Sequence, residues 1–183
     1  MRRLLAHSLA VLLTLPVAGA VMVLTSTAAD AASTSRSDPR DGEGDLDLRT
    51  VALRTSGSTL VARFTTYGAV SRDDLDNANS LNLRFKVRPN KARQVTVKYI
   101  SGKLTAVICT VGIPSRDCSR LRVSRTSATS FRVAIPRSTI KPGATAYRWR
   151  ASSVAWTRTA GCGTAPSCVD NVPGKEKYLV WRP

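Results

Sequence analysis

The sequence predicts an all-β protein, an antiparallel β-sandwich of jelly-roll-like layout with roughly eight to ten strands and two short-range disulfides. Apolar residues alternate with polar ones along most of the chain after residue 45, which is the pattern of half-buried strands. Turn-forming residues separate these segments, and one stretch, PRSTIKPG, is expected to form a short helical turn. The roughly 150 residues after the N-terminal segment are the size of one domain.

The first 31 residues are predicted to be an export signal. Two arginines precede a long apolar run from Leu4 to Leu24, and Ala29-Asp30-Ala31 has the small-x-small pattern of a cleavage site. Cleavage after Ala31 would give a secreted chain with no membrane span. The alternative is a membrane-anchored chain with an uncleaved N-terminal segment, because about 20 apolar residues can span a bilayer.

An acidic lead-in over residues 32–44 precedes a single β-sandwich domain over residues 45–183. The lead-in is polar apart from Pro39, so we expect it to be flexible, with regular structure beginning at Leu46. In the first strand the apolar residues stand at even positions up to Leu48 and at odd positions from Val51 onward. A continuous strand with a single buried face does not allow this change. A β-bulge near Arg49-Thr50 would reconcile the two halves.

The later strands follow in order. Alternation is clear from Leu60 to Thr65 and from Leu81 to Arg88. Ser101-Gly102 lies between two alternating segments and predicts a hairpin turn. Ser71 is a natural cap for a turn or helix start at the acids that follow it. The remaining predicted strands are QVTVKYIS, KLTAVICT, LRVS, SFRVAI, TAYRWRASSVAW and YLVW.

Four cysteines lie in the exported part of the chain, where disulfides persist. Three pairings are possible. We favour Cys109 with Cys118 and Cys162 with Cys168, because each pair brackets a turn-rich loop. A zinc site is the rival interpretation, but there is no Cys-x-x-Cys pair and no histidine after residue 7.

The order of these features resembles a group of uncharacterised exported proteins of Gram-positive bacteria. The matching segments are DPRDGEGDLDLRTVAL, TLVARFTTYG, IPRSTIKPG, YRWRASS and the late CVDNVP. The layout is also similar to DOMON and family 9 carbohydrate-binding modules over nearly the whole exported chain. The resemblance implies a β-sandwich and no particular activity.

Composition argues against catalysis. Without His7 the exported chain has no histidine, which excludes Ser-His, Cys-His and His-metal arrangements, and oxidised cysteines are not nucleophiles. We therefore predict that the protein is not an enzyme. Glycoside hydrolysis remains a minor alternative because it needs only two carboxylates. The candidate carboxylates are Glu43, Asp45, Asp73, Asp74 and Asp170.

Five acids lie close together between Asp38 and Asp47, at the junction of lead-in and domain, in a chain with a formal charge of +16. Crowded carboxylates are stable when they face water, pair with arginine or bind a hard cation such as calcium. The predicted calcium ligands are Asp41, Glu43, Asp45 and Asp170. The alternative is a solvated lead-in that pairs with arginines.

The rest of the chain is strongly basic, with 17 basic residues and one acid between Asn77 and Val169. A basic face follows if two arginine-bearing segments are neighbouring strands, and its residues are Arg84, Lys86, Arg88, Arg148 and Arg150. Partners of such a face outside a cell are anionic polymers. Aromatic residues are too sparse for a specialised nucleic-acid binder. A basic surface without a dedicated ligand is the alternative.

Two tryptophans near loops or the C-terminal end, Trp156 and Trp181, are candidates for stacking on a sugar ring, with core packing as the alternative. The predicted function is an exported, monomeric, non-catalytic binding or accessory module. Its first version is a calcium-stabilised binder of carbohydrate or cell-envelope glycan. Its alternative is electrostatic adhesion to anionic polymers through the basic face.

Overall fold

The computed structural model describes residues 32–41, 44–76, 78–89, 91–112, 117–156, 167–175 and 177–183. Antiparallel strands dominate these ranges, which confirms the predicted all-β class. The strands are β1 (Ser33–Ser37), β2 (Leu48–Ser56), β3 (Thr59–Thr66), β4 (Ser80–Arg88), β5 (Lys91–Ile100), β6 (Lys103–Val111), β7 (Cys118–Ser127), β8 (Ser130–Pro136), β9 (Tyr147–Ala155), β10 (Cys168–Val172) and β11 (Leu179–Trp181).

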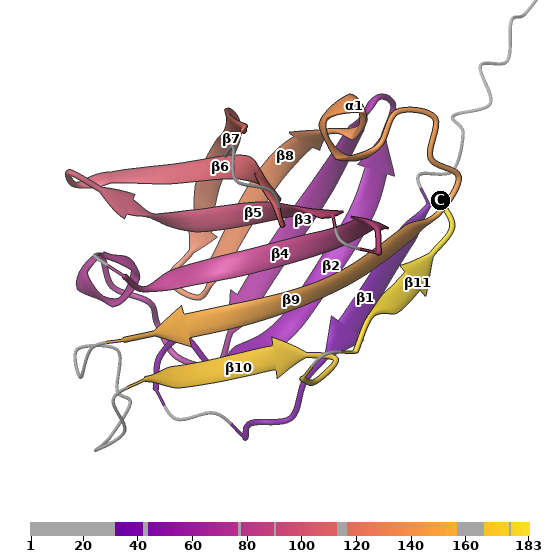
Figure 1. Cartoon of the computed structure of the whole chain (residues 1–183). Coiled ribbons are helices and arrows are strands. Elements are labelled where there is room, and N and C mark those ends of the chain that lie inside the picture. Colours follow the sequence, from indigo (N-terminus) through magenta and orange to yellow (C-terminus); the bar gives the residue numbers. More distant parts are fainter. Residues whose placement is uncertain are drawn as a thin grey trace, which may run out of the picture.

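The strands form one continuous hydrogen-bonded path in place of the two separate sheets of a sandwich. The order is β1-β2-β3-β8-β7-β6-β5-β4-β9-β10, and β11 pairs with β9 beyond the end of β10. Figure 1 shows that the path folds into two layers, with β4, β5, β6, β9 and β10 crossing over β1, β2, β3 and β8. The backbone N–H of Leu48 on β2 donates to Asp170 Oδ2 on β10 at 2.7 Å, so the two ends of the path nearly meet.

Strand β7 explains why the two layers are continuous. Its first part, Cys118–Leu121, pairs with β6, and the residues from Arg122 onward pair with β8. One long strand therefore belongs to both layers and turns the sheet back on itself. The sequence of β7 shows its length and alternation but not the change of partner part-way along it.

The core lies between the two layers and is built from the inward residues of each strand. The aromatic rings of Phe85 and Tyr147 lie 6.0 Å apart, and those of Tyr147 and Trp181 also lie 6.0 Å apart. Truncating such a buried aromatic side chain costs about 3–5 kcal/mol of folding free energy. The largest fully buried side chains include Trp149, Phe64, Phe85, Phe131, Leu48, Leu53, Leu60 and Leu75.

Several local predictions are confirmed. The register of β2 against β3 shifts between Leu48 and Thr50, which places the bulge at Arg49 as predicted. Ser101 and Gly102 both have positive φ, 48° and 76°, and form the tight turn of the β5–β6 hairpin. The predicted helical turn is α1 (Arg137–Ile140).

The turn after Ser71 is also confirmed. It is the 3₁₀ helix η1 (Asp73–Leu75). The backbone N–H of Asp74 donates to Ser71 Oγ at 3.2 Å, and the N–H of Ser71 donates to Asp74 Oδ2 at 2.6 Å. This reciprocal pair is the arrangement of a capping box, so Ser71 caps the turn as expected.

The prediction of an unstructured lead-in is wrong in its first part. Ser33–Ser37 forms β1 and pairs antiparallel with β2 over Thr50–Arg54. Its side chains are mostly exposed, so the strand is held by backbone hydrogen bonds and shows no apolar alternation. A purely polar edge strand of this kind has no hydrophobic period from which to predict it.

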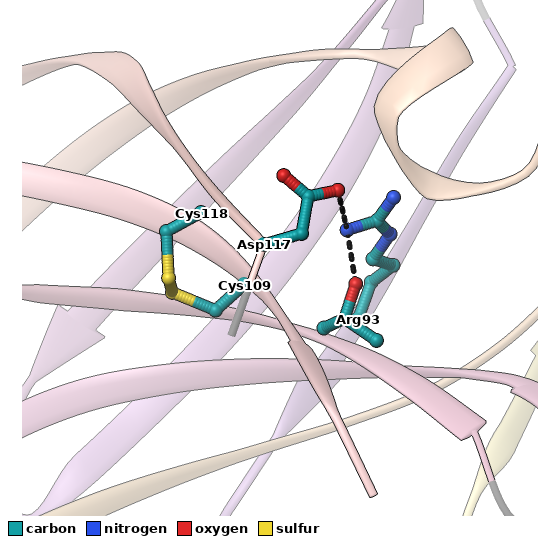
Figure 2. A network of polar contacts seen from close by, with 5 residues as sticks. Arg93, Cys109, Asp117 and Cys118 are labelled. Atoms are coloured by element: carbon teal, nitrogen blue, oxygen red, sulfur yellow. Dashed lines mark hydrogen bonds and ion pairs between the residues drawn. A yellow bond between two sulfur atoms is a disulfide. The ribbon is translucent and has the colours of Figure 1, made fainter. Parts of the chain in front are cut away.

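The predicted Cys109–Cys118 disulfide is present. It joins β6 to the start of β7, where β7 pairs with β6. Closing a loop of this length contributes about 2–3 kcal/mol by restricting the unfolded chain. Figure 2 shows Arg93 of β5 beside this bridge, with its guanidinium hydrogen-bonded to Thr110 and 3.5 Å from Asp117. Cys168 is disulfide-bonded too, whereas Cys162 lies outside the described residues, so the second pairing stays a prediction.

The N-terminal signal prediction falls on residues 1–31, outside the described ranges. Across the residues that are described, no helix combines the length and the apolar character needed to cross a membrane.

Candidate functional site

The basic face predicted from sequence is assembled by the pairing of β4 with β9. In this antiparallel register Arg84 lies opposite Arg150, and Lys86 lies opposite Arg148. All four point away from the core, because the alternate residues between them, Phe85 and Trp149, are buried and also lie opposite each other. The condition for a basic face, that these two segments are neighbouring strands, is therefore met.

The ring of Tyr178 lies beside three of these cations. Its ring centroid is 5.2 Å from the guanidinium carbon of Arg150 and 5.9 Å from that of Arg148. The ammonium nitrogen of Lys86 is 5.9 Å from the same ring. Arg84, Lys86, Arg148, Arg150 and Tyr178 are called the cationic cluster below. Cation–π attraction holds the charges near the ring, at about 0.5–1 kcal/mol for each exposed pair.

The charges of the cationic cluster are not neutralised by the described protein. None of the outward residues of β4, β9 and β10 is acidic. The side chains of Arg84, Arg148 and Arg150 have no carboxylate partner among the described residues. Arg84 is half-buried, and its Nε has no hydrogen-bond partner within the same part of the chain. The arrangement therefore offers several converging donors to an anion.

Arg88, the fifth predicted member of the basic face, is placed apart. The register of β4 shifts between Lys86 and Arg88, and Arg88 pairs with Lys91 of β5 rather than with β9. The side chain is exposed and adds positive charge beyond the end of the cluster.

A carboxylate cluster forms at the edge of the same layer, where β10 pairs with β9. Asp38, Asp41 and Asp170 each present an oxygen within 4.8 Å of the others. Asp38 is positioned by two backbone contacts, because its N–H donates to the carbonyl of Arg49 at 3.0 Å and Tyr67 Oη donates to its carbonyl at 2.8 Å. The lead-in is thereby held against β2 and the end of β3, close to β10.

Burial perturbs the protonation of this cluster. Desolvation raises the pKa of Asp170 from its ordinary value of 3.8 to about 7, with further increases from Asp38, Asp47 and Asp41. The hydrogen bond from Leu48 N–H opposes the rise. Burial and the charge of Asp41 also raise the pKa of Asp38. At neutral pH the cluster therefore binds a proton readily, and its oxygens have the ligand chemistry of a hard cation site.

Two of the predicted calcium ligands, Asp41 and Asp170, are brought together, and a third residue, Asp38, completes the cluster. Asp45 lies elsewhere, against Gly68, where an added Cβ would be 2.6 Å from Asp45 Oδ1. Glu43 is outside the described residues. Asp38 is not among the predicted ligands, because the alternation of Asp41, Glu43 and Asp45 gives no signal for a residue before Pro39.

The two predicted aromatic ligand residues differ in exposure. Trp156 is 56% exposed at the end of β9, so its ring is accessible. Trp181 is 5% exposed and packs beside Tyr147 in the core, which corrects its assignment as a binding residue. Tyr178, three residues earlier, is the aromatic residue that contacts the basic face.

The candidate glycosidase carboxylates are also separated by the fold. Asp73 and Asp74 belong to the capped turn of η1, and Asp74 is occupied by its bond to Ser71. Asp45 contacts Gly68, and Asp170 lies in the carboxylate cluster.

No protein-family model, curated protein or solved structure matches this chain. The function is therefore argued from the geometry of the two clusters.

The raised pKa of Asp170 predicts a pH-dependent stability. The folded state holds this proton more tightly than the unfolded state, so the free energy of unfolding falls as the pH rises from about 4 through about 7. The loss is at most about 4 kcal/mol, at about 1.4 kcal/mol per pKa unit, and solvent screening reduces it. Asp170→Asn keeps an acceptor for Leu48 N–H, and should flatten this dependence in urea titrations at several pH values.

The matched control is Asp73→Asn, which removes an exposed acid outside the cluster. This variant should keep the wild-type pH profile. If Asp170→Asn and the wild type lose stability equally between pH 4 and pH 8, a buried proton at Asp170 does not account for the profile.

Proposed function

We propose that this protein is an exported, non-catalytic module that binds anionic polymers of the cell envelope through the cationic cluster. The observation that carries the proposal is two adjacent like-charged cross-strand pairs, Arg84 with Arg150 and Lys86 with Arg148. Three of these cations contact the ring of Tyr178, and none of the arginines has a carboxylate partner among the described residues. The proposal takes up the alternative function predicted from the sequence, which is electrostatic adhesion to anionic polymers through the basic face.

The energetics of a sheet favour this interpretation. Like charges directly opposite one another on adjacent strands destabilise the pair. Arg84 with Arg150 and Lys86 with Arg148 make two such pairs side by side. A bound polyanion would offset the repulsion, and guanidinium groups can donate two parallel hydrogen bonds to a phosphate or carboxylate group.

The shape of the surface supports a polymer rather than a small ligand. The cations lie along two extended strands, with Arg88 and Lys91 continuing the charge past the end of the pairing. No enclosed cavity is needed to bind a chain that carries one anionic group per repeat. The high formal charge of +16 adds long-range attraction to such a chain.

Calcium binding by the carboxylate cluster is a second candidate function, favoured by the approach of three carboxylate oxygens to within 4.8 Å of one another. A cation there would join the lead-in to β10 and offset the burial and the carboxylate repulsion that raise the pKa of Asp170. It would stabilise the fold without taking part in polymer binding. Carbohydrate binding at exposed Trp156 is a weaker proposal, because one ring alone forms no platform.

For the cationic cluster, Arg84→Gln with Arg150→Gln should lower the affinity for short-chain inorganic polyphosphate about tenfold or more. Each charged hydrogen bond lost is worth about 1.5 kcal/mol. Calorimetric titration at low salt measures the effect. The wild-type affinity should fall steeply as salt is raised, because screening weakens exposed charge contacts.

The control for this pair is Lys103→Gln with Lys141→Gln, which makes the same change in net charge at exposed sites outside β4, β9 and the loop of Tyr178. It should lower affinity less than threefold. Equal losses in the two double variants would mean that net charge, and not the cluster, governs binding.

For the carboxylate cluster, millimolar calcium should raise the melting temperature of the wild type by several degrees at pH 8, and chelator should reverse the rise. Asp41→Asn should remove the response, since it deletes a ligand that is exposed and not required for packing. A melting temperature that is identical with calcium and with chelator would exclude the site.

A further inference from the structure

The outer face of the other layer carries a second group of arginines. Arg63 of β3 lies directly opposite Arg132 of β8. Arg54 of β2 lies alongside, and all three side chains are exposed. With Ser33 and Ser35 of β1 they line a groove of about 620 Å³, called the second groove below.

The chemistry of the second groove suits an anion. Its lining contains three guanidinium groups, several hydroxyl groups and small apolar side chains, and no acidic residue. Arg63 and Arg132 form a like-charged cross-strand pair, and neither has a carboxylate partner among the described residues. The features that mark the cationic cluster therefore recur here, without the central tyrosine.

Strand β1 makes the groove. Ser33 pairs with Arg54 and Ser35 with Ala52, so β1 extends the layer by one strand and adds a polar wall beside the arginines. The edge strand that sequence periodicity missed is thus part of this surface. An edge strand contributes hydroxyl donors without adding a negative charge.

The second groove and the cationic cluster face opposite sides of the molecule. The inward neighbours of Arg63 and Arg132, which include Phe64, Phe131 and Val133, are buried in the core. The inward neighbours of the cationic cluster, Phe85 and Trp149, lie in the same core cluster. The two arginine surfaces therefore point away from each other, one from each layer of Figure 1.

We propose that the second groove is a second polyanion site, so that one monomer bridges two anionic polymer chains. This inference rests on the proposed function and extends it from adhesion to cross-linking. The second groove binds more weakly than the cationic cluster, because its arginines are more exposed and contact no aromatic ring among the described residues. Each molecule should therefore bind a tight and a weaker equivalent of short-chain polyphosphate.

The test compares two double variants with the lysine control. Arg63→Gln with Arg132→Gln removes charge from the second groove at exposed positions of strands, so the fold should be kept, which a thermal melt verifies. Calorimetry with short-chain polyphosphate counts the equivalents bound. Light scattering with long-chain polyphosphate measures cross-linking, and sedimentation without polymer establishes that the protein is monomeric.

Wild type and the Lys103→Gln, Lys141→Gln control should bind two equivalents and cross-link long chains. The second-groove variant should keep the tight equivalent, lose the weaker one and scatter at least fivefold less. The Arg84→Gln, Arg150→Gln variant should keep one weaker equivalent and also fail to cross-link.

The outcomes separate this inference from the proposed function. If wild type binds one equivalent, and Arg84→Gln with Arg150→Gln abolishes it, the cationic cluster is the binding site and the second groove is not. If the second-groove variant scatters light as strongly as wild type, the second groove does not bridge polymer chains. If wild type binds no polyphosphate, both proposals fail.

Discussion

The pairing of β4 with β9 is the constraint on which the rest of the structure depends. These strands lie about sixty residues apart in the sequence, yet one register sets both of their faces. Phe85 opposite Trp149 fills the core, and the same register necessarily places Arg84 opposite Arg150 on the outside. The burial of large aromatic side chains outweighs the repulsion between exposed charges, because burying one such side chain contributes about 2–3 kcal/mol and surface charge pairs contribute less than about 1 kcal/mol. The packing of the core therefore determines where the charges of the cationic cluster lie. Tyr178, from the chain after β10, packs against three of them.

Charge is segregated around this core rather than mixed over the surface. The described carboxylates of the lead-in gather at the junction with β10, where Asp170 accepts the Leu48 N–H and helps bring the two ends of the sheet together. The arginines occupy the outer faces of both layers, opposite one another across strands. Such an arrangement gives up some stability through like-charge repulsion, and that loss is recovered if a polyanion binds. Backbone hydrogen bonds hold the lead-in near β2, and Arg40 and Arg49 lie 5.9 and 6.0 Å from the ring of Tyr67 beside it.

Much of the fold could be predicted from local patterns. The parity change between Leu48 and Val51 predicted the bulge at Arg49, and Ser101-Gly102 predicted a hairpin, because both depend on residues adjacent in the chain. The continuous sheet could not be predicted, since β7 changes partner without any change in its own alternation. Some residues of the candidate sites could likewise be predicted from local patterns, and others could not. The arginine-bearing strands were recognisable from alternation, whereas Tyr178, Asp38 and the second groove depend on contacts between distant segments.

The central claim is that the cationic cluster contacts the polymer directly, and arginine side-chain spectroscopy tests it most directly. Nitrogen-15 labelled protein would be titrated with short-chain polyphosphate while the Nε–Hε resonances of arginine and the ring signals of Tyr178 are followed. Direct contact predicts that the resonances of Arg84 and Arg150 shift first and saturate with the tight equivalent, together with those of Tyr178. If polyphosphate binds while these resonances stay unchanged and those of Arg88 or the two control lysines shift instead, the cationic cluster is not the binding site.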